Sequence, residues 1–139
     1  MDHRNLEISS QLAELSVVRQ FLRDFCNLLL TQGYREENLL ELELAVNEAA
    51  TNIIKHAYHG REDQEIRIDA ESEADRVVIR IGYYGDSFNP EAVPPPSFDG
   101  SRSNGFGVYL IKTCVDEVRY TQDEQGQNWI YLMKLFSKT

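Results

Sequence analysis

One predicted helix, over about residues 36–58, constrains the fold most. At 100° per residue its apolar side chains fall in one continuous arc, and such an arc predicts a helix packed against a hydrophobic core. The arc consists of Leu42, Ala45, Val46, Ala49, Ala50, Ile53, Ile54 and Ala57. On the other side lie Glu48, Asn52 and Lys55. Because positions four apart share a helix face, Glu48 and Asn52 can offer a carboxylate and an amide oxygen to one ligand, although the same row could equally be a solvated surface.

The segment before this helix predicts a short strand followed by a helix. Residues 6–8 indicate the strand, and Ser9 or Ser10 is expected to cap the helix that follows. Its apolar positions recur three and four residues apart between residues 15 and 29, and Gly33 is expected to end it.

Strands dominate the second half of the chain. Residues 66–70 and 77–81 alternate apolar and polar side chains, so we expect two antiparallel strands joined by a hairpin turn at residues 71–75. Residues 118–121 and 129–136 predict a final hairpin. Exposed apolar side chains on this sheet could form a surface for a homodimer, although packing in the core explains them equally well.

Between the two hairpins lies a long segment rich in Gly, Pro, Ser and Asp, from Gly82 to Gly107. Its three consecutive prolines, residues 94–96, favour an extended, stiff backbone. Loops of this length inside a domain often act as lids over a site. A helix is expected directly after it, over residues 106–117.

Length and charge limit the classes of protein. The 139 residues, 42% of them hydrophobic, fit one domain over residues 1–139. The net charge of −9, from 14 basic and 23 acidic residues, argues against direct nucleic acid binding and suits a basic partner protein. Cys26 and Cys114 lie in apolar helical patterns, where buried free thiols are expected, as in a reducing cytoplasm. No apolar run near 18 residues and no signal-like start is present, so we expect an unexported protein with no membrane segment.

A glycine motif, Asn104-Gly105-Phe106-Gly107, opens directly into the helix expected after the long loop. Backbone N–H groups and the positive end of the helix dipole converge at such a point, where an anion can bind. Glycine also lets a phosphate approach the main chain closely. Taken alone, the motif favours an ordinary helix-entry turn over a phosphate site.

Four segments together resemble the bacterial anti-sigma factor serine-protein kinases, the RsbW-like branch of the GHKL ATPases. The run from Glu41 to Tyr58 resembles the N box of this family, and the run from Tyr84 to Pro90 resembles its first glycine box. Gly105 to Val118 resembles the second glycine box with its helix, and residues 128–134 resemble the last strand. The resemblance implies an α+β fold: a two-layer sandwich of a mixed, mainly antiparallel sheet covered on one face by helices, known as the Bergerat or GHKL ATP-binding fold.

The resemblance also implies roles for single residues. Asn52 matches the magnesium ligand of the family, and Glu48 matches the residue that acts as general base or orients the nucleophile. These roles suit phosphoryl transfer, which needs a metal on the phosphates and an acceptor for the hydroxyl proton. Positions implied to bind ATP besides Asn52 are Gly85, Asp86, Arg102, Gly105, Phe106, Gly107 and Val108.

Tyr83 departs from the family pattern. The family usually carries an Asp there that accepts a hydrogen bond from the adenine amino group, and a phenol does not reproduce that acceptor. Leaving the amino group unpaired would cost on the order of 1–3 kcal/mol. Asp86 could take over through a shifted loop, or it could be an ordinary turn carboxylate.

Two functional readings follow from the resemblance. The first is an anti-sigma factor with ATP- and Mg²⁺-dependent serine kinase activity on a STAS-type antagonist, acting by partner switching. The second, prompted by Tyr83, is a stoichiometric protein-binding module with a decayed nucleotide pocket. His56 is expected to be structural and Lys55 to be solvated.

Overall fold

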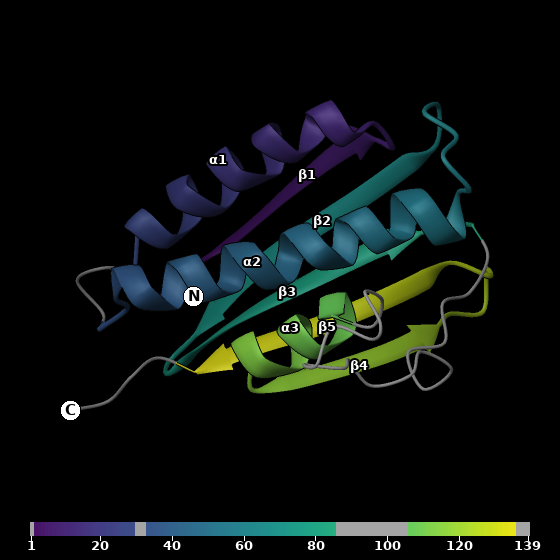
Figure 1. The fold of residues 1–139 in the computed structure, drawn as a ribbon. Helices are drawn as coiled ribbons and strands as arrows, with labels where there is room; N and C mark the ends of the chain where they lie inside the picture. Colours follow the sequence, from purple (N-terminus) through teal and green to yellow (C-terminus); the bar gives the residue numbers. More distant parts are fainter. Residues whose placement is uncertain (1, 30–32, 86–105, 136–139) are drawn as a thin grey trace, which may run out of the picture.

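The computed structural model describes residues 2–29, 33–85 and 106–135, which form a five-stranded sheet with helices on one face (Figure 1). The elements in chain order are β1 (His3–Ser9), a 3-10 turn (Leu12–Glu14), α1 (Leu15–Asn27), α2 (Glu36–Asn52), a π-helical turn (Ile53–Ala57), β2 (Glu65–Glu73), β3 (Arg76–Tyr83), α3 (Phe106–Cys114), β4 (Glu117–Gln122) and β5 (Asn128–Leu135). The strand order is β1-β2-β3-β5-β4. The expected two-layer α+β class is confirmed, and every pairing between described strands is antiparallel.

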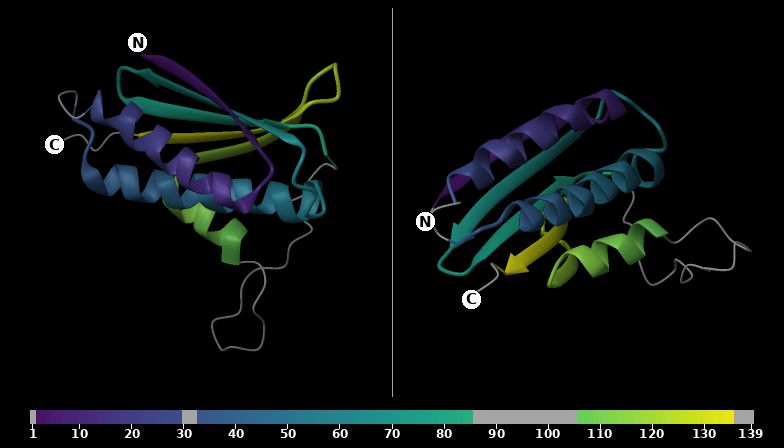
Figure 2. Two further views of the ribbon diagram at one scale, coloured as in Figure 1. Left: turned by 90° about the horizontal axis from the view of Figure 1, so that it is seen from above. Right: turned by 60° about the vertical axis from the view of Figure 1, so that its left-hand side comes forward.

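The core lies between the sheet and the helices, which all pack on the same side of it (Figure 2). The predicted apolar arc, which runs along α2 into the π-helical turn, is buried at all eight positions, from Leu42 to Ala57. Every second side chain of β2 and β3 points from the sheet toward this arc, because successive side chains of a strand point to opposite faces. The helix therefore has one face in the core, and Asn52 of its polar row lies beside Ile111 of α3.

Several boundaries differ from the expectations. Neither serine caps α1, because a 3-10 turn comes first; Ser9 instead bonds Glu14, and the Ser10 hydroxyl bonds the Arg61 carbonyl. That same hydroxyl accepts the Gln64 N–H at 3.1 Å, so Ser10 ties the end of β1 to the loop before β2.

The helix α1 ends at Asn27, before the expected Gly33. The hairpin turn is also shorter than expected, because Glu73 still pairs with Arg76. Gly82 and Tyr83 belong to β3 rather than to a loop, since they pair with Trp129 and Asn128 of β5.

The expected helix over residues 106–117 ends at Cys114. Asp116 is hydrogen-bonded to β5 and no longer helical. Its N–H donates to the Met133 carbonyl at 2.8 Å, and its carboxylate accepts the Leu135 N–H at 2.7 Å. The strand β4 therefore begins at Glu117.

Candidate functional site

The candidate catalytic pair, Glu48 and Asn52, lies on α2 as the sequence predicted. Both side chains are partly buried, and neither makes a hydrogen bond or an ion pair with another described residue. Asn52 is the last α-helical residue, and the π-helical turn begins directly after it. Such π turns are rare and often occur at functional sites. The chain thus holds a carboxylate and an amide on one helix face with no partner that occupies them.

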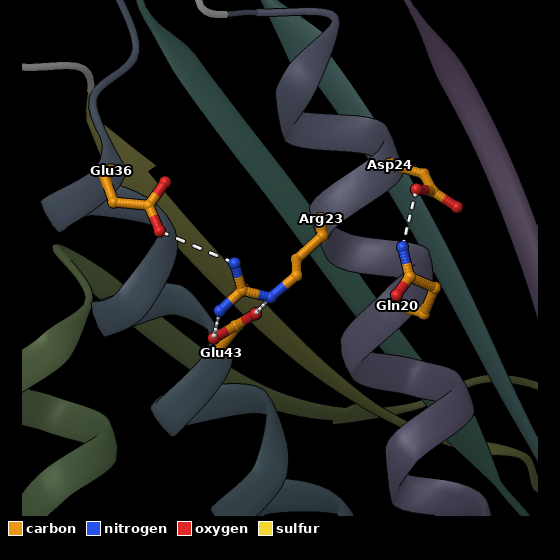
Figure 3. Close-up of polar contacts among 5 residues, drawn as sticks. All are labelled: Gln20, Arg23, Asp24, Glu36 and Glu43. Carbon is orange, nitrogen blue, oxygen red and sulfur yellow. Dashed lines mark hydrogen bonds and ion pairs between the residues drawn. The ribbon is translucent and has the colours of Figure 1, made fainter.

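Ion pairs single out Glu48 among the five glutamates of α2. Arg23 of α1 pairs with Glu43 through Nε and Oε1 at 2.9 Å and with Glu36 through Nη1 and Oε1 at 3.6 Å (Figure 3). Glu41 pairs with Lys134. Glu37 is exposed in the first turn of the helix. Glu48 is therefore the one partly buried glutamate of α2 whose carboxylate has no partner among the described residues.

Asn52 borders a small hollow between α2, α3 and the sheet. Its walls are Ala49, Asn52, Ile53, Ile111, Tyr120 and Ile130. The space between them is too narrow to admit a water molecule. The described residues therefore pack closely at this point, with Asn52 at the edge of the contact.

The helix α3 begins at Phe106, so the implied nucleotide-binding positions Phe106, Gly107 and Val108 all lie in its first turn. The N–H groups of a first helical turn have no partner within the helix and are free to meet an anion. The remaining implied positions Asp86, Arg102 and Gly105 lie outside the described residues.

Gly85 is packed against the end of the π-helical turn. A Cβ at this position would lie 2.4 Å from the carbonyl oxygen of Ala57 and 2.7 Å from Cδ1 of Tyr58. The Gly85 carbonyl accepts the side-chain amide N–H of Asn128 at 2.9 Å. Close packing against a helix thus accounts for a glycine here, and the implied approach of adenine stays a prediction.

Two further residues of this region, Tyr58 and Asn128, were not among the expected site residues. The buried Tyr58 hydroxyl donates to the Glu65 carbonyl at 2.6 Å and accepts the Tyr84 N–H at 2.8 Å. With Asn128, it fixes the point where the chain leaves β3. The sequence gives no hint of this, because buried Tyr and Asn residues occur in any core strand or helix.

Tyr83 is buried at the end of β3, with 2% of its surface exposed. Its ring meets that of Tyr58 edge to face, with centroids 6.3 Å apart and planes at 84°. Burial raises the pKa of Tyr58, and burial followed by the proximity of Tyr83 raises the pKa of Tyr120 to about 12. These phenols are neutral at physiological pH, so the described inner face of the sheet at this end carries no charged acceptor.

The donor set near Asn52 fits a magnesium ion carried by a nucleotide. Within residues 2–29, 33–85 and 106–135, no three His, Cys, Asp or Glu side chains are grouped to hold a metal ion by themselves. Magnesium in nucleotide sites takes one or two protein oxygens and completes its shell with phosphate and water. A single amide oxygen at Asn52 suits that mode of binding.

Other expectations are met away from the site. Both cysteines are free and buried, and burial raises the pKa of Cys26 to about 11. Lys55 and His56 are exposed, so the expected solvated lysine is confirmed. No helix among the described residues is long and apolar enough to cross a membrane.

A sheet covered on one face by helices, with a Glu and Asn pair on the helix beside α3 and a glycine in the first turn of α3, is typical of an ATPase-type α+β sandwich. Residues 8–134 match the family described as "Histidine kinase-like ATPase domain", and the chain belongs to this family. Membership implies that the domain binds ATP. The family resemblance inferred from the sequence is thereby confirmed.

Named relatives place the chain near one branch of the family. It is 34% identical over 100 residues to the serine-protein kinase RsbW of Listeria innocua, a match that covers 66% of this chain and 64% of that protein. It is 28% identical over 133 residues to the serine-protein kinase RsbW of Bacillus subtilis, covering 90% and 81%. The match to the Listeria protein thus spans less than two thirds of its length.

A crystal structure of the RsbU and RsbW domains of a Mycobacterium tuberculosis protein has the same fold. It superposes with a TM-score of 0.69 over 97% of this chain and 32% of that chain, at 15% identity. At this identity the likeness concerns the fold alone.

Proposed function

We propose that this protein is an anti-sigma factor and an ATP-dependent serine protein kinase that phosphorylates a STAS-type antagonist in a partner-switching pathway. The observation that carries the proposal is the pair Glu48 and Asn52 on α2, unpartnered among the described residues, on the helix that packs beside α3 and its first-turn Gly107. Relatives named serine-protein kinase RsbW support it.

The proposed mechanism needs three contributions from the chain. Asn52 would hold Mg²⁺, which supplies neutralisation of the phosphate charge when it is bound. The first-turn N–H groups of α3 bind phosphate oxygens. Glu48 accepts the proton of the attacking serine hydroxyl while the serine oxygen forms its bond to the terminal phosphorus, and the bond from that phosphorus to the bridging oxygen breaks to release ADP.

The partners proposed are a sigma factor and its STAS-domain antagonist. The net charge of −9 favours association with a basic segment of a partner protein. We take residues 1–139 as a single kinase-like domain that acts in the cytoplasm, with a homodimer as one possible assembly.

A second candidate, a binding module without catalysis, rests on Tyr83. Its buried phenol stands where the family usually carries the adenine-binding Asp, and it offers no carboxylate to the adenine amino group. Under this reading the protein would bind its partner stoichiometrically whether or not ATP is present.

The test uses labelled ATP, Mg²⁺ and a purified STAS-domain protein. The kinase proposal expects label on a serine of that protein, and Glu48→Ala should lower the rate by about 10²–10⁴-fold, the usual contribution of a general base. Glu37→Ala is the matched control, because it removes an exposed carboxylate from the same helix and should leave the rate unchanged.

Asn52→Ala should weaken ATP binding in calorimetry. If the wild-type protein binds its partner but no ATP at millimolar concentration, the binding-module reading replaces the kinase. If Glu48→Ala and Glu37→Ala label the partner equally fast, Glu48 is not the base.

A further inference from the structure

Lys134 is a lysine inside the protein. It lies on β5 with 8% of its surface exposed, on the face that the helices cover. Lysine is rarely buried unless it is paired, because its charge loses the hydration of bulk water. Its ammonium donates to the Cys114 carbonyl, with Nζ and O 2.8 Å apart, and lies 3.3 Å from Oε1 of Glu41. One buried cation thus joins the sheet to two helices.

Its first partner, the Cys114 carbonyl, belongs to the last residue of α3. The final carbonyls of a helix lack partners within the helix and carry the negative end of its dipole, so a cation there is favourable. Its second partner, Glu41, lies in the N-terminal half of α2. Lys134 therefore holds the C-terminal end of α3 against the first half of α2.

The opposite end of α3 points toward the candidate site. Ile111, one turn before Cys114, lines the hollow with Asn52 and Ile53, so α3 runs antiparallel to α2 (Figure 1). At a rise of about 1.5 Å per residue, Phe106 lies about 12 Å from Cys114 along the axis. A helix held at Cys114 therefore places Ile111 beside Asn52, and its first turn lies about 5–8 Å further along the axis, past the C-terminal end of α2.

Stability alone is a weak reason to bury this charge. A buried ion pair often adds little to the free energy of unfolding compared with a well-packed apolar side chain, and its best-attested role is to fix one arrangement among several. Two antiparallel helices packed through small and branched side chains can slide along one another. A charge that must meet both Glu41 and the end of α3 selects one lengthwise register.

We propose that Lys134 is a positioning residue, which fixes α3 against α2 so that the N–H groups of its first turn lie at a defined distance beyond Asn52. This role rests on the proposed nucleotide site, because register matters to function only where α3 and α2 share a ligand. Neither Lys134 nor Glu41 touches the nucleotide itself.

The test compares Lys134→Met, Glu41→Gln and Lys134→Arg with a control, Arg80→Met. Methionine keeps the length and packing of the side chain without the charge. The control removes a different sheet cation, whose Nη1 lies 2.8 Å from Oε2 of Glu71 on the uncovered face. Glu41→Gln weakens the ion pair with Lys134 at its half-exposed partner, so this variant should fold even where Lys134→Met does not.

Two measurements are made on each variant: hydrogen exchange of the α3 amides without nucleotide, and the Kd for ATP with Mg²⁺. We expect Lys134→Met to speed α3 exchange and to raise the Kd about tenfold, with the exchange of α2 unchanged. Glu41→Gln should shift both in the same direction by about threefold, while Lys134→Arg and the control should stay within twofold of wild type.

If the α3 amides of both Lys134→Met and Glu41→Gln exchange within twofold of the wild-type rate, Lys134 does not hold α3 in place. If α3 exchanges faster while the Kd for ATP is unchanged, the position of α3 does not affect nucleotide binding. If wild-type protein binds no ATP, the proposed function fails while the exchange data still decide whether Lys134 holds α3.

Discussion

Tyr58→Phe should destabilise the fold through the loss of one hydroxyl group. Tyr58 lies just after the π-helical turn and is 1% exposed. Its hydroxyl donates to the Glu65 carbonyl at 2.6 Å and accepts the Tyr84 N–H at 2.8 Å. Phenylalanine keeps the ring, so the change removes two hydrogen bonds without making a large cavity.

The expected cost follows from those two bonds. Each contributes about 1 kcal/mol net, and the backbone groups left behind have little access to water, so we expect the free energy of unfolding to fall by about 2 kcal/mol. For a chain of 139 residues, 1 kcal/mol shifts Tm by about 3–4 °C, which gives a drop of about 6–8 °C.

Urea unfolding followed by circular dichroism measures this change, with Tyr131→Phe as the matched control. The Tyr131 ring lies on the uncovered face of the sheet between two guanidinium groups, whose Cζ atoms are 5.5 Å (Arg80) and 5.3 Å (Arg119) from its centroid. Its hydroxyl makes no hydrogen bond to the described residues, so its loss should cost less than about 0.5 kcal/mol. If Tyr58→Phe also costs less than about 0.5 kcal/mol, the two bonds do not hold the end of β3.

Two further predictions concern packing and pH. Gly85→Ala should lower the free energy of unfolding in urea by about 2 kcal/mol or more, because its Cβ would lie 2.4 Å from the Ala57 carbonyl oxygen. Gly82→Ala should cost less, because its Cβ would meet the movable Trp129 ring at 2.8 Å. A larger loss for Gly82→Ala than for Gly85→Ala would contradict this reasoning. Burial raises the pKa of the Cys26 thiol from 9.0 to about 11, so its contribution to stability is complete below pH 9.0 and is lost as the pH rises through 11. The urea midpoint should fall over that window, and Cys26→Ala should flatten the fall; an equal fall in both proteins would assign it to other groups.

The fold could be predicted from the sequence largely because its periodicities are strong. The apolar arc on α2 and the alternation in β2 and β3 depend only on which side chains avoid water, and both are borne out by burial. The errors lie at boundaries, where one tertiary contact decides. Ser10 was expected to cap a helix, but it bonds Arg61 and Gln64, which lie about fifty residues further along the chain.

The candidate site could be predicted only in part. The placement of Glu48 and Asn52 on one helix is confirmed, because residues four apart on a helix are visible in the sequence, while their roles stay a prediction. The contacts around this region are not visible in the sequence, because Lys134, Tyr58 and Asn128 bond to partners between 7 and 93 residues away. Nothing in the local sequence distinguishes these three from an ordinary surface lysine, core tyrosine or strand asparagine.

These hidden contacts place the site between two anchors at opposite ends of β5. Asn128, the first residue of the strand, holds Gly85, and Lys134 holds the C-terminal end of α3. The two anchors are six positions apart in the strand, which corresponds to about 20 Å. Because β5 is paired on both sides, by β3 and β4, it cannot stretch or slip without breaking two ladders. The strand therefore sets the distance between the two segments on which nucleotide binding is proposed, and a site made of common residue types acquires a defined geometry from the sheet beneath it.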